Sequence, residues 1–178
     1  MTDKRAHKRG FVIREANAAD KAVLVQFLIK LTLHVSGAEP QALKQEEHQR
    51  LLSVLQSALD DDDKRLYVAE VADVGLVGMG YVYVWRSQGI WEQTEPVEYR
   101  SGVIDDIWVE PDYRSLGVLK ALLKRLVAFA ESHNAHELVL EYSLANKQAK
   151  AVWTKLGFKT TGVRASAFPS TVKAALEQ

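Results

Sequence analysis

The sequence of 178 residues contains no cysteine. Disulfides, thiol nucleophiles and thiolate metal sites are therefore excluded, and cysteine usage says nothing about the redox state of the compartment. Lys plus Arg total 23 and Asp plus Glu total 23, so the formal net charge is zero. The broad positive field with which proteins attract nucleic acid or anionic membranes is missing, and we expect neither as a partner.

Long apolar runs are also missing. No stretch approaches the roughly 20 apolar residues that a membrane-spanning helix needs, and the N-terminus shows no secretory signal. Residues 1–9 are basic and are expected to form a flexible tail. Because the length and composition are typical of one globular domain, we expect residues 1–178 to form a single domain in the cytoplasm, the default compartment for such a chain.

The histidines give no metal-binding pattern. None of the five forms a pair with the spacing of metal ligands, and no nucleophile-elbow sequence accompanies them. We therefore expect no metal and no Ser-His-Asp catalysis.

The apolar periodicity predicts a mixed α/β fold. Strands are expected at residues 11–14, 66–71, 76–85, 103–109 and 136–142, with a last extended segment starting at Phe158. Helices are expected from residues 16–20 to about Val35, after Pro40 to Leu59, at 116–130 and at 146–156. Residues 72–75 suit the turn of an antiparallel hairpin between the second and third strands.

Two features of the third strand and the segment after it stay open. Gly78 and Gly80 inside the strand indicate a bulge, a close approach by another group, or easy twisting without functional meaning. Residues 87–101, which include Trp91 and Tyr99, form either a loop that covers a site or a plain surface hairpin.

A strand-to-helix turn at residues 114–120 reads Arg-Ser-Leu-Gly-Val-Leu-Lys. The first amides of the helix that follows lack partners within the helix, and together with the helix dipole they favour a bound anion. Gly117 lets the backbone approach such a ligand, while Arg114 and Lys120 add positive charge that the neutral chain does not otherwise provide. The turn therefore predicts a phosphate site.

Two segments in this order resemble the motifs of the GNAT superfamily of N-acetyltransferases. Residues 104–123 read IDDIWVEPDYRSLGVLKALL, against a family pattern of a strand, Val-x-Pro-x-Tyr-Arg and Arg-x-x-Gly-x-Gly/Ala. Residues 146–158 read NKQAKAVWTKLGF, against an Asn followed by Ala, an aromatic residue and Gly-Phe. The resemblance covers roughly residues 11–163. It implies a mixed α/β (α+β), mostly antiparallel central sheet of about six to seven strands, flanked by about four helices, with splayed parallel strands in the middle.

The resemblance also implies the substrates and the residues that hold them. Acetyl-CoA would be the acyl donor, and a primary amine of a small molecule or peptide the acceptor. Main-chain groups of Ile107, Trp108 and Val109 would pair with the pantetheine arm like an added strand, and Asn146 would meet the pantetheine or the acyl end. The amides that hold the pyrophosphate would be those of Ser115, Leu116, Gly117, Val118, Leu119 and Lys120. The family also makes a homodimer a candidate assembly.

Asp105 and Asp106 are the candidates for the base and for recognition of the amine. Adjacent strand positions face opposite sides, so one carboxylate is expected to face the acyl slot and the other the opposite layer. A carboxylate in the slot attracts a cationic amine and, through water, takes its proton before attack on the thioester. Resembling family members that acylate polyamines carry a Glu-Asp pair here. The alternative is that both carboxylates cap backbone groups or pair with Arg100 or Lys120.

Two positions depart from the family pattern. Leu119 stands where the family has Gly or Ala, and it either crowds the pyrophosphate or turns into the core with Leu122. Trp153 stands where the family commonly places a Tyr that protonates the leaving thiolate. Because an indole does not ionise at working pH, the proton would come from water, from another hydroxyl such as Tyr142, or from no group at all.

These departures leave alternative functions open. A catalytically weak or inactive relative would keep the fold as a CoA-binding or interaction module. An acyltransferase for a longer acyl chain is a further alternative, in which the four tryptophans shape a wider slot.

Overall fold

The computed structural model describes residues 10–37, 44–87, 89–90, 92–94, 97–143 and 145–177. The chain divides into two compact units, Met1–Glu141 and Tyr142–Gln178. The expected tail at residues 1–9 lies outside the described residues, as do Pro40 and Trp91.

The first unit is built on a five-stranded sheet in the order β1-β2-β3-β4-β5. The strands are β1 (Phe11–Glu15), β2 (Lys64–Val71), β3 (Gly75–Arg86), β4 (Arg100–Val109) and β5 (Glu137–Leu140). Neighbouring strands are antiparallel except β4 and β5, which are parallel. The predicted α/β fold, with a mostly antiparallel sheet and one parallel pair, is confirmed.

The sheet has fewer strands than the expected six to seven. Residues 158–168, which the sequence predicts to begin a last extended strand, join no sheet among the described residues. Within this part of the chain β5 is therefore an edge strand, and the parallel pair lies at the side of the sheet instead of its middle. The chain continues into α5 (Pro169–Leu176), which was not predicted because its apolar side chains, such as Val172 and Leu176, are exposed and mark no buried stripe.

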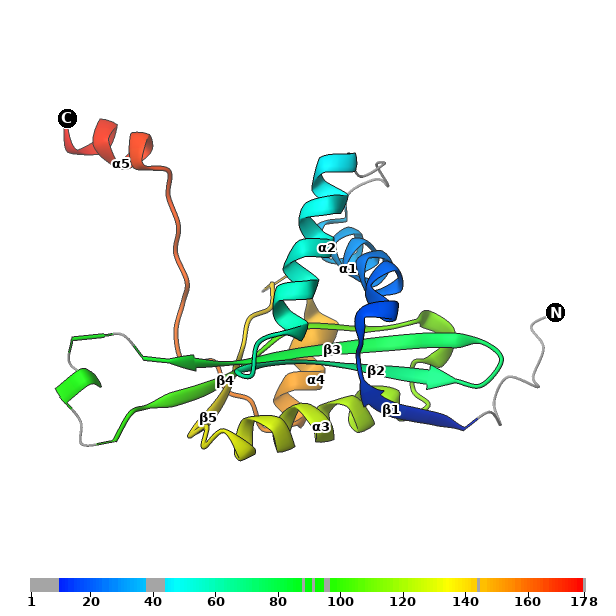
Figure 1. Cartoon of the computed structure of the whole chain (residues 1–178). Helices are drawn as coiled ribbons and strands as arrows, with labels where there is room; N and C mark the ends of the chain where they lie inside the picture. Colours follow the sequence, from blue (N-terminus) through cyan, green and yellow to red (C-terminus); the bar gives the residue numbers. More distant parts are fainter. Residues whose placement is uncertain are drawn as a thin grey trace. The chain divides into compact units, whose positions relative to one another are not determined.

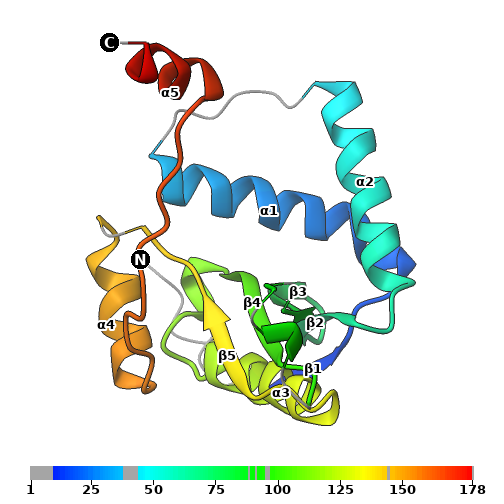
Figure 2. The same ribbon diagram turned by 90° about the vertical axis from the view of Figure 1, so that its left-hand side faces the viewer.

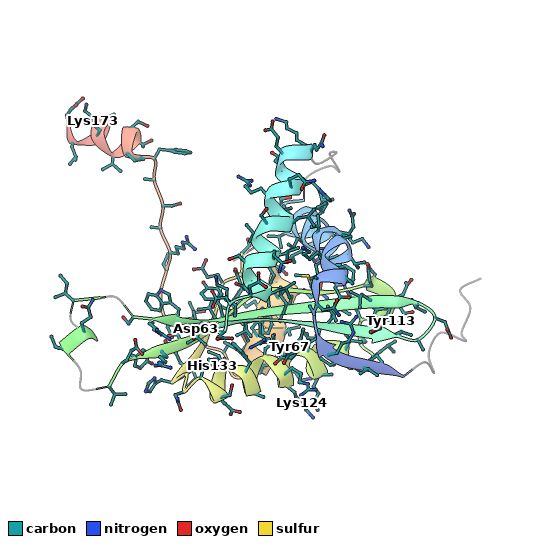
Figure 3. All side chains as sticks on the ribbon, in the orientation of Figure 1. Asp63, Tyr67, Tyr113, Lys124, His133 and Lys173 are labelled. Carbon is teal, nitrogen blue, oxygen red and sulfur yellow. The ribbon has the colours of Figure 1, made fainter. Side chains whose placement is uncertain are left out.

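Helices cover both faces of the sheet. α1 (Lys21–Ser36) and α2 (Gln45–Leu59) lie on one face, and α3 (Val118–Ser132) lies on the other (Figure 1, Figure 2). Lys124, on the outer side of α3, points away from the sheet (Figure 3). The buried cluster beneath α1 and α2 consists of Leu24, Val25, Phe27, Leu55, Ala58, Leu66, Val68, Met79 and Trp108. Among the described helices, none combines the length and apolar character that crossing a bilayer requires.

A buried ion pair holds the start of α1 against the sheet. Asp20 is only 7% exposed, and its carboxylate accepts hydrogen bonds of 2.7 and 2.9 Å from the Arg14 guanidinium. Arg14 also donates to Glu70 on β2 at 2.6 Å. The hydrogen bonds from Arg14 lower the pKa of Asp20, so this carboxylate stays ionised and α1 stays joined to β1.

Small residues let α3 lie close to the sheet. A Cβ added to Gly80 would lie 3.1 Å from the Cδ1 of Leu126, and one added to Gly102 would lie 2.6 Å from the Cβ of Ala130. For Gly78 and Gly80, the reading that another group approaches closely is therefore confirmed. The glycines bring the N-terminus of α3 against the end of β4, where the predicted phosphate turn lies.

The second unit contains α4 (Lys147–Lys155) and α5. The Oδ1 of Asn146 accepts a hydrogen bond of 2.9 Å from the amide of Ala149, which caps the first turn of α4. Gly157 has a φ of 95°, in the left-handed region where helices commonly end. The predicted helix at 146–156 is confirmed.

We expect Gly102→Ala to destabilise the protein by about 1–3 kcal/mol, because the new methyl group would overlap the Cβ of Ala130, which has no other rotamer. The free energy of unfolding from urea denaturation measures this effect. Gly162→Ala is the matched control, since a Cβ there meets nothing within 4 Å, and it should change stability by less than about 0.5 kcal/mol. Equal stability of the two variants would contradict the close approach of α3.

Candidate functional site

An extra residue in β4 interrupts its pairing with β3. Between two matched pairs, β3 advances by one residue, Tyr81, while β4 advances by two, Asp105 and Asp106. Two residues opposite one are a β-bulge, which bends the strand locally and re-aims its side chains.

The bulge turns both carboxylates to the same face of the sheet. Gly102 faces α3, whereas Trp108 belongs to the cluster beneath α1 and α2. Side chains alternate between the two faces along a strand. Asp105 is three residues after Gly102 and therefore faces away from α3, toward α1. Asp106 is two residues before Trp108 and therefore faces the same side as Trp108, which is also the α1 side. The expectation that the two carboxylates face opposite layers is wrong, because the inserted residue shifts the alternation between them.

The two carboxylates lie beside Tyr81 and form a negatively charged group with reduced hydration. Loss of hydration and the neighbouring charge of Asp105 raise the pKa of Asp106 to about 6. Asp105 is itself exposed, yet partial desolvation and the carboxylate of Glu141 raise its pKa as well. Burial, with the two carboxylates among the nearby charges, raises the pKa of Tyr81 to about 12. Since every charge named here is negative, a bound cation would be stabilised.

Neither carboxylate pairs with a protein cation within the described residues. Arg100 donates to Glu98 at 2.9 Å and to the carbonyl of His133 at 3.2 Å. Lys120 makes no hydrogen bond or ion pair in the described part of the chain. The predicted alternative, in which Arg100 or Lys120 neutralises the pair, is not what this structure has.

Beyond the bulge, one edge of β4 is open. β5 pairs with β4 only over Ser101–Ile104, and no other described strand pairs with this edge. The amide of Glu110 bonds back to β3 at 2.9 Å, and antiparallel backbone groups alternate in direction. Ile107 and Val109 therefore present their polar backbone groups to the open edge, whereas those of Trp108 face β3. Ile107, Trp108 and Val109 were expected to pair with pantetheine through their main-chain groups. The main-chain groups of Ile107 and Val109 point toward the open edge, as such pairing requires.

Arg114 links the turn to the end of β4. Its Nε donates to the carbonyl of Val109 at 3.0 Å, and its guanidinium carbon lies 5.0 Å from the centre of the Trp108 ring. The positive charge predicted for the turn is therefore held beside the open edge.

The turn before α3 presents a run of unpaired amides. The first helical hydrogen bond runs from the amide of Ala121 to the carbonyl of Gly117, at 3.0 Å, and the amides of Ser115–Lys120 make no backbone hydrogen bond among the described residues. Ser115 and Gly117 have φ values of 63° and 88°, so the backbone curls and aims successive N–H groups in a concave arrangement. Such a loop ahead of a helix dipole fits a diphosphate.

Leu119 lies at the margin of the buried side of α3. The buried residues of the helix are Val118, Leu122, Leu123, Leu126, Phe129 and Ala130. Leu119 and Val127, both predicted for this stripe, are only half-buried. The helix begins at Val118, two residues later than predicted, and its buried side includes Val118 and Phe129 in place of Leu119 and Val127. Leu119 therefore does not turn fully into the core.

Three predicted site residues belong to the second unit. Asn146 caps α4 through its Oδ1, and the ring of Trp153 meets that of Phe158 edge-on at 5.6 Å between centroids. Tyr142 is half-buried.

Tyr81 is the site residue that the sequence did not reveal. It reads as an ordinary position in an apolar strand, and only the register between β3 and β4 places it opposite the carboxylates. The neighbouring glycines were a signal of irregularity at this point, but they do not say which strand carries the extra residue.

Comparison with known proteins identifies relatives of this chain. The sequence profile of the Acetyltransferase (GNAT) family matches residues 31–158. Streptothricin acetyltransferase from Streptomyces lavendulae is 30% identical over 112 residues, which are 63% of this chain and 53% of that enzyme. The chain thus spans about half the length of this relative. Aminoglycoside N(6')-acetyltransferase type 1 from Stenotrophomonas maltophilia is 26% identical over 149 residues, 84% of this chain and 86% of that enzyme.

Solved structures share the same fold. A predicted acetyltransferase from Clostridium acetobutylicum, crystallised with acetyl-CoA, superposes with a TM-score of 0.71 and 23% identity, covering 89% of this chain and 96% of that one. An identity this low establishes the fold alone. The profile match extends over most of the chain and includes the turn, the open edge and the bulge. The chain therefore belongs to the GNAT family of acetyltransferases.

Proposed function

We propose that this protein transfers an acetyl group from acetyl-CoA to a primary amine of a small, cationic molecule. The observation that carries the proposal is the run of unpaired amides at Ser115–Lys120, from which the open edge of β4 leads back to two carboxylates without a cation. Acetyl-CoA has a diphosphate at one end, a pantetheine arm with amide groups in the middle and a thioester at the other end. These parts match the turn, the edge and the bulge in that order.

The protein groups that would hold acetyl-CoA follow from this match. The amides of the turn, with the charges of Arg114 and Lys120, would bind the diphosphate. The backbone groups of Ile107 and the amide of Val109 would hydrogen-bond the pantetheine amides, since the Val109 carbonyl already accepts from Arg114. A strand rises about 3.3 Å per residue, so the bulge lies about 10–13 Å from the end of β4, a span that an extended pantetheine arm can cover.

The two carboxylates supply the acid–base chemistry. The acceptor arrives as an ammonium ion, which the negative group stabilises, and the carboxylate of Asp106 takes its proton directly or through water. The neutral nitrogen then attacks the thioester carbonyl carbon, the C–N bond forms, the C–S bond breaks, CoA leaves as the thiolate, and the nitrogen gives its second proton to water. In our proposal Tyr142 returns a proton to this thiolate, while Asn146 and Trp153 border the acyl end.

The charge of the site and the names of two relatives support this class of acceptor. The unpaired carboxylates favour a cationic amine, and the two antibiotic acetyltransferases named above act, by their names, on streptothricin and on aminoglycosides. We propose an acceptor of that kind. A peptide amine is the second acceptor to test, since the same chemistry serves an N-terminal amine.

The proposed reaction predicts thiol release from acetyl-CoA in the presence of at least one amine among kanamycin, streptothricin, spermidine and an alanine-starting peptide. Release of CoA thiol, measured colorimetrically, should be highest with the polycationic antibiotics, with mass spectrometry showing one added acetyl group. Binding of acetyl-CoA without turnover of any amine would instead support a CoA-binding module. No binding at all would refute the proposal.

The phosphate turn predicts that Gly117→Val weakens acetyl-CoA binding by about 10- to 100-fold, because a β-branched residue is strained at a φ of 88° and would move the amides. Calorimetric titration measures the dissociation constant. Acetyl-pantetheine, which has no diphosphate, should bind the variant within about threefold of the wild type. Gly75→Val is the matched control, since Gly75 has a φ of 96° at the start of β3, and it should leave acetyl-CoA binding unchanged.

The raised pKa of Asp106 predicts a pH-dependent role in catalysis. Only the ionised carboxylate accepts a proton, so the rate advantage of wild type over Asp106→Asn should shrink as the pH falls below about 6 and reach a plateau of about 10²- to 10⁴-fold above it. At each pH the kcat/KM of the wild type is divided by that of the variant. The ionisation of the amine affects both values equally and cancels in this ratio. A ratio that does not vary between pH 5 and 8 would contradict this role.

The same carboxylate should cost the fold stability at neutral pH. A pKa raised from 3.8 to about 6 means that the folded state holds the proton more tightly than the unfolded chain. The stabilisation this provides is complete below pH 4 and is lost as the pH rises through 6. Asp106→Asn should therefore raise the free energy of unfolding by about 1–2 kcal/mol at pH 8 and change it little at pH 4. Equal effects at both values would contradict the burial of this charge.

A further inference from the structure

Trp108 contains a buried hydrogen-bond donor without a partner. The side chain is 7% exposed, and its indole Nε1 makes no hydrogen bond within the described residues. An indole nitrogen can only donate a hydrogen bond, so the polar group of this side chain is left without any partner among the described residues. Buried donors in native proteins are nearly always hydrogen-bonded, so an unpaired one requires an explanation, and a ligand that accepts the hydrogen bond is one.

The indole lies at the rim of the apolar cluster, where polar side chains meet it. The ring of His34 on α1 approaches it edge-on at 5.9 Å between centroids, and the Arg114 guanidinium lies 5.0 Å from its centre. His34 is exposed and Arg114 half-buried, so the indole lies between the buried cluster and side chains at the surface. An ion pair between Lys30 and Glu110 holds α1 over this end of β4.

The position of Trp108 on β4 relates it to the carboxylates. Asp106 and Trp108 are two residues apart and face the same side, so their Cβ atoms are about 6–7 Å apart. Hydrogen bonds add about 3 Å at each end. A molecule whose amine nitrogen and oxygen are a few bonds apart can therefore place the nitrogen at Asp106 and the oxygen near the indole N–H at the same time.

We infer that the indole N–H of Trp108 donates a hydrogen bond to a hydroxyl or carbonyl oxygen of the acyl acceptor. Trp108 thereby selects amines that carry such an oxygen, such as amino sugars and amino amides, over plain alkyl amines and polyamines. The inference rests on the proposed transfer to an amine and names the acceptor more narrowly. A site built to bind an oxygen discriminates strongly, because a ligand without it leaves the buried donor unpaired.

A carbonyl of the pantetheine arm is the other oxygen that this donor could meet. The direction of the side chain favours the acceptor, because side chains stand roughly perpendicular to a sheet whereas the open edge of β4 lies in its plane. The indole leaves β4 on the face of Asp105, Asp106 and Tyr81.

The test compares aminopentanol with pentylamine, which lacks only the hydroxyl, in the wild type and in Trp108→Phe. We expect wild-type kcat/KM to favour aminopentanol by at least about tenfold, and Trp108→Phe to reduce this preference to within about threefold. The dissociation constant of acetyl-CoA should change by less than about threefold. Met79→Leu is the control for packing, since Met79 is the residue of β3 directly opposite Trp108, and it should keep the preference.

Several results would overturn the inference. One is a wild type that uses both amines equally, and another is a Trp108→Phe variant that keeps the preference. A variant that keeps the preference but binds acetyl-CoA at least about tenfold more weakly would assign the donor to the cofactor instead. The affinities of the two amines for the CoA-saturated protein, measured by calorimetry, separate this inference from the proposed function, because they do not depend on acetyl transfer. If no amine is acetylated, equal affinities for the two amines, or binding of neither amine, would still overturn the inference.

Discussion

The single extra residue in β4 is the constraint on which the site depends. It puts Asp105 and Asp106 on one face opposite Tyr81, where an uninterrupted strand would separate them by the thickness of the sheet. The pairing of β4 with β5 ends at Ile104, directly before the bulge, so the strand edge becomes open at the same place. One local irregularity therefore brings two acidic groups together at the end of an open backbone edge.

The second constraint is the distance between α3 and the sheet. Glycines at positions 78, 80 and 102 have no side chains to separate the helix from the strands, so Val118 and Leu126 pack directly on β3, and Ala130 packs directly on β4. The N-terminus of α3 is thereby held beside the end of β4. Because the turn before α3 is only a few residues long, close packing of the helix also determines where the unpaired amides point.

The site is made of groups that the fold leaves unsatisfied. They are amides without protein acceptors, carboxylates without cations and a buried indole N–H without an acceptor, and the buried donor among them is the kind of group that a bound ligand can complete. Their coincidence at one end of β4 distinguishes this region from the core beneath α1 and α2, where the ionised Asp20 is fully paired with Arg14. Leu119, which departs from the family pattern, lies at the start of α3 beside these unpaired amides.

The sequence by itself determined most elements and the turn before α3, because apolar periodicity, turn residues and helix capping are local properties of the chain. It did not predict α5, whose apolar side is not buried, and it predicted a strand after Phe158 that does not form. The rotation of α3 that buries Val118 instead of Leu119 depends on the glycines beneath it. Only the tertiary structure decided that both carboxylates share a face with Tyr81 and Trp108, since a bulge is defined by the register of two strands and neither strand carries that register alone.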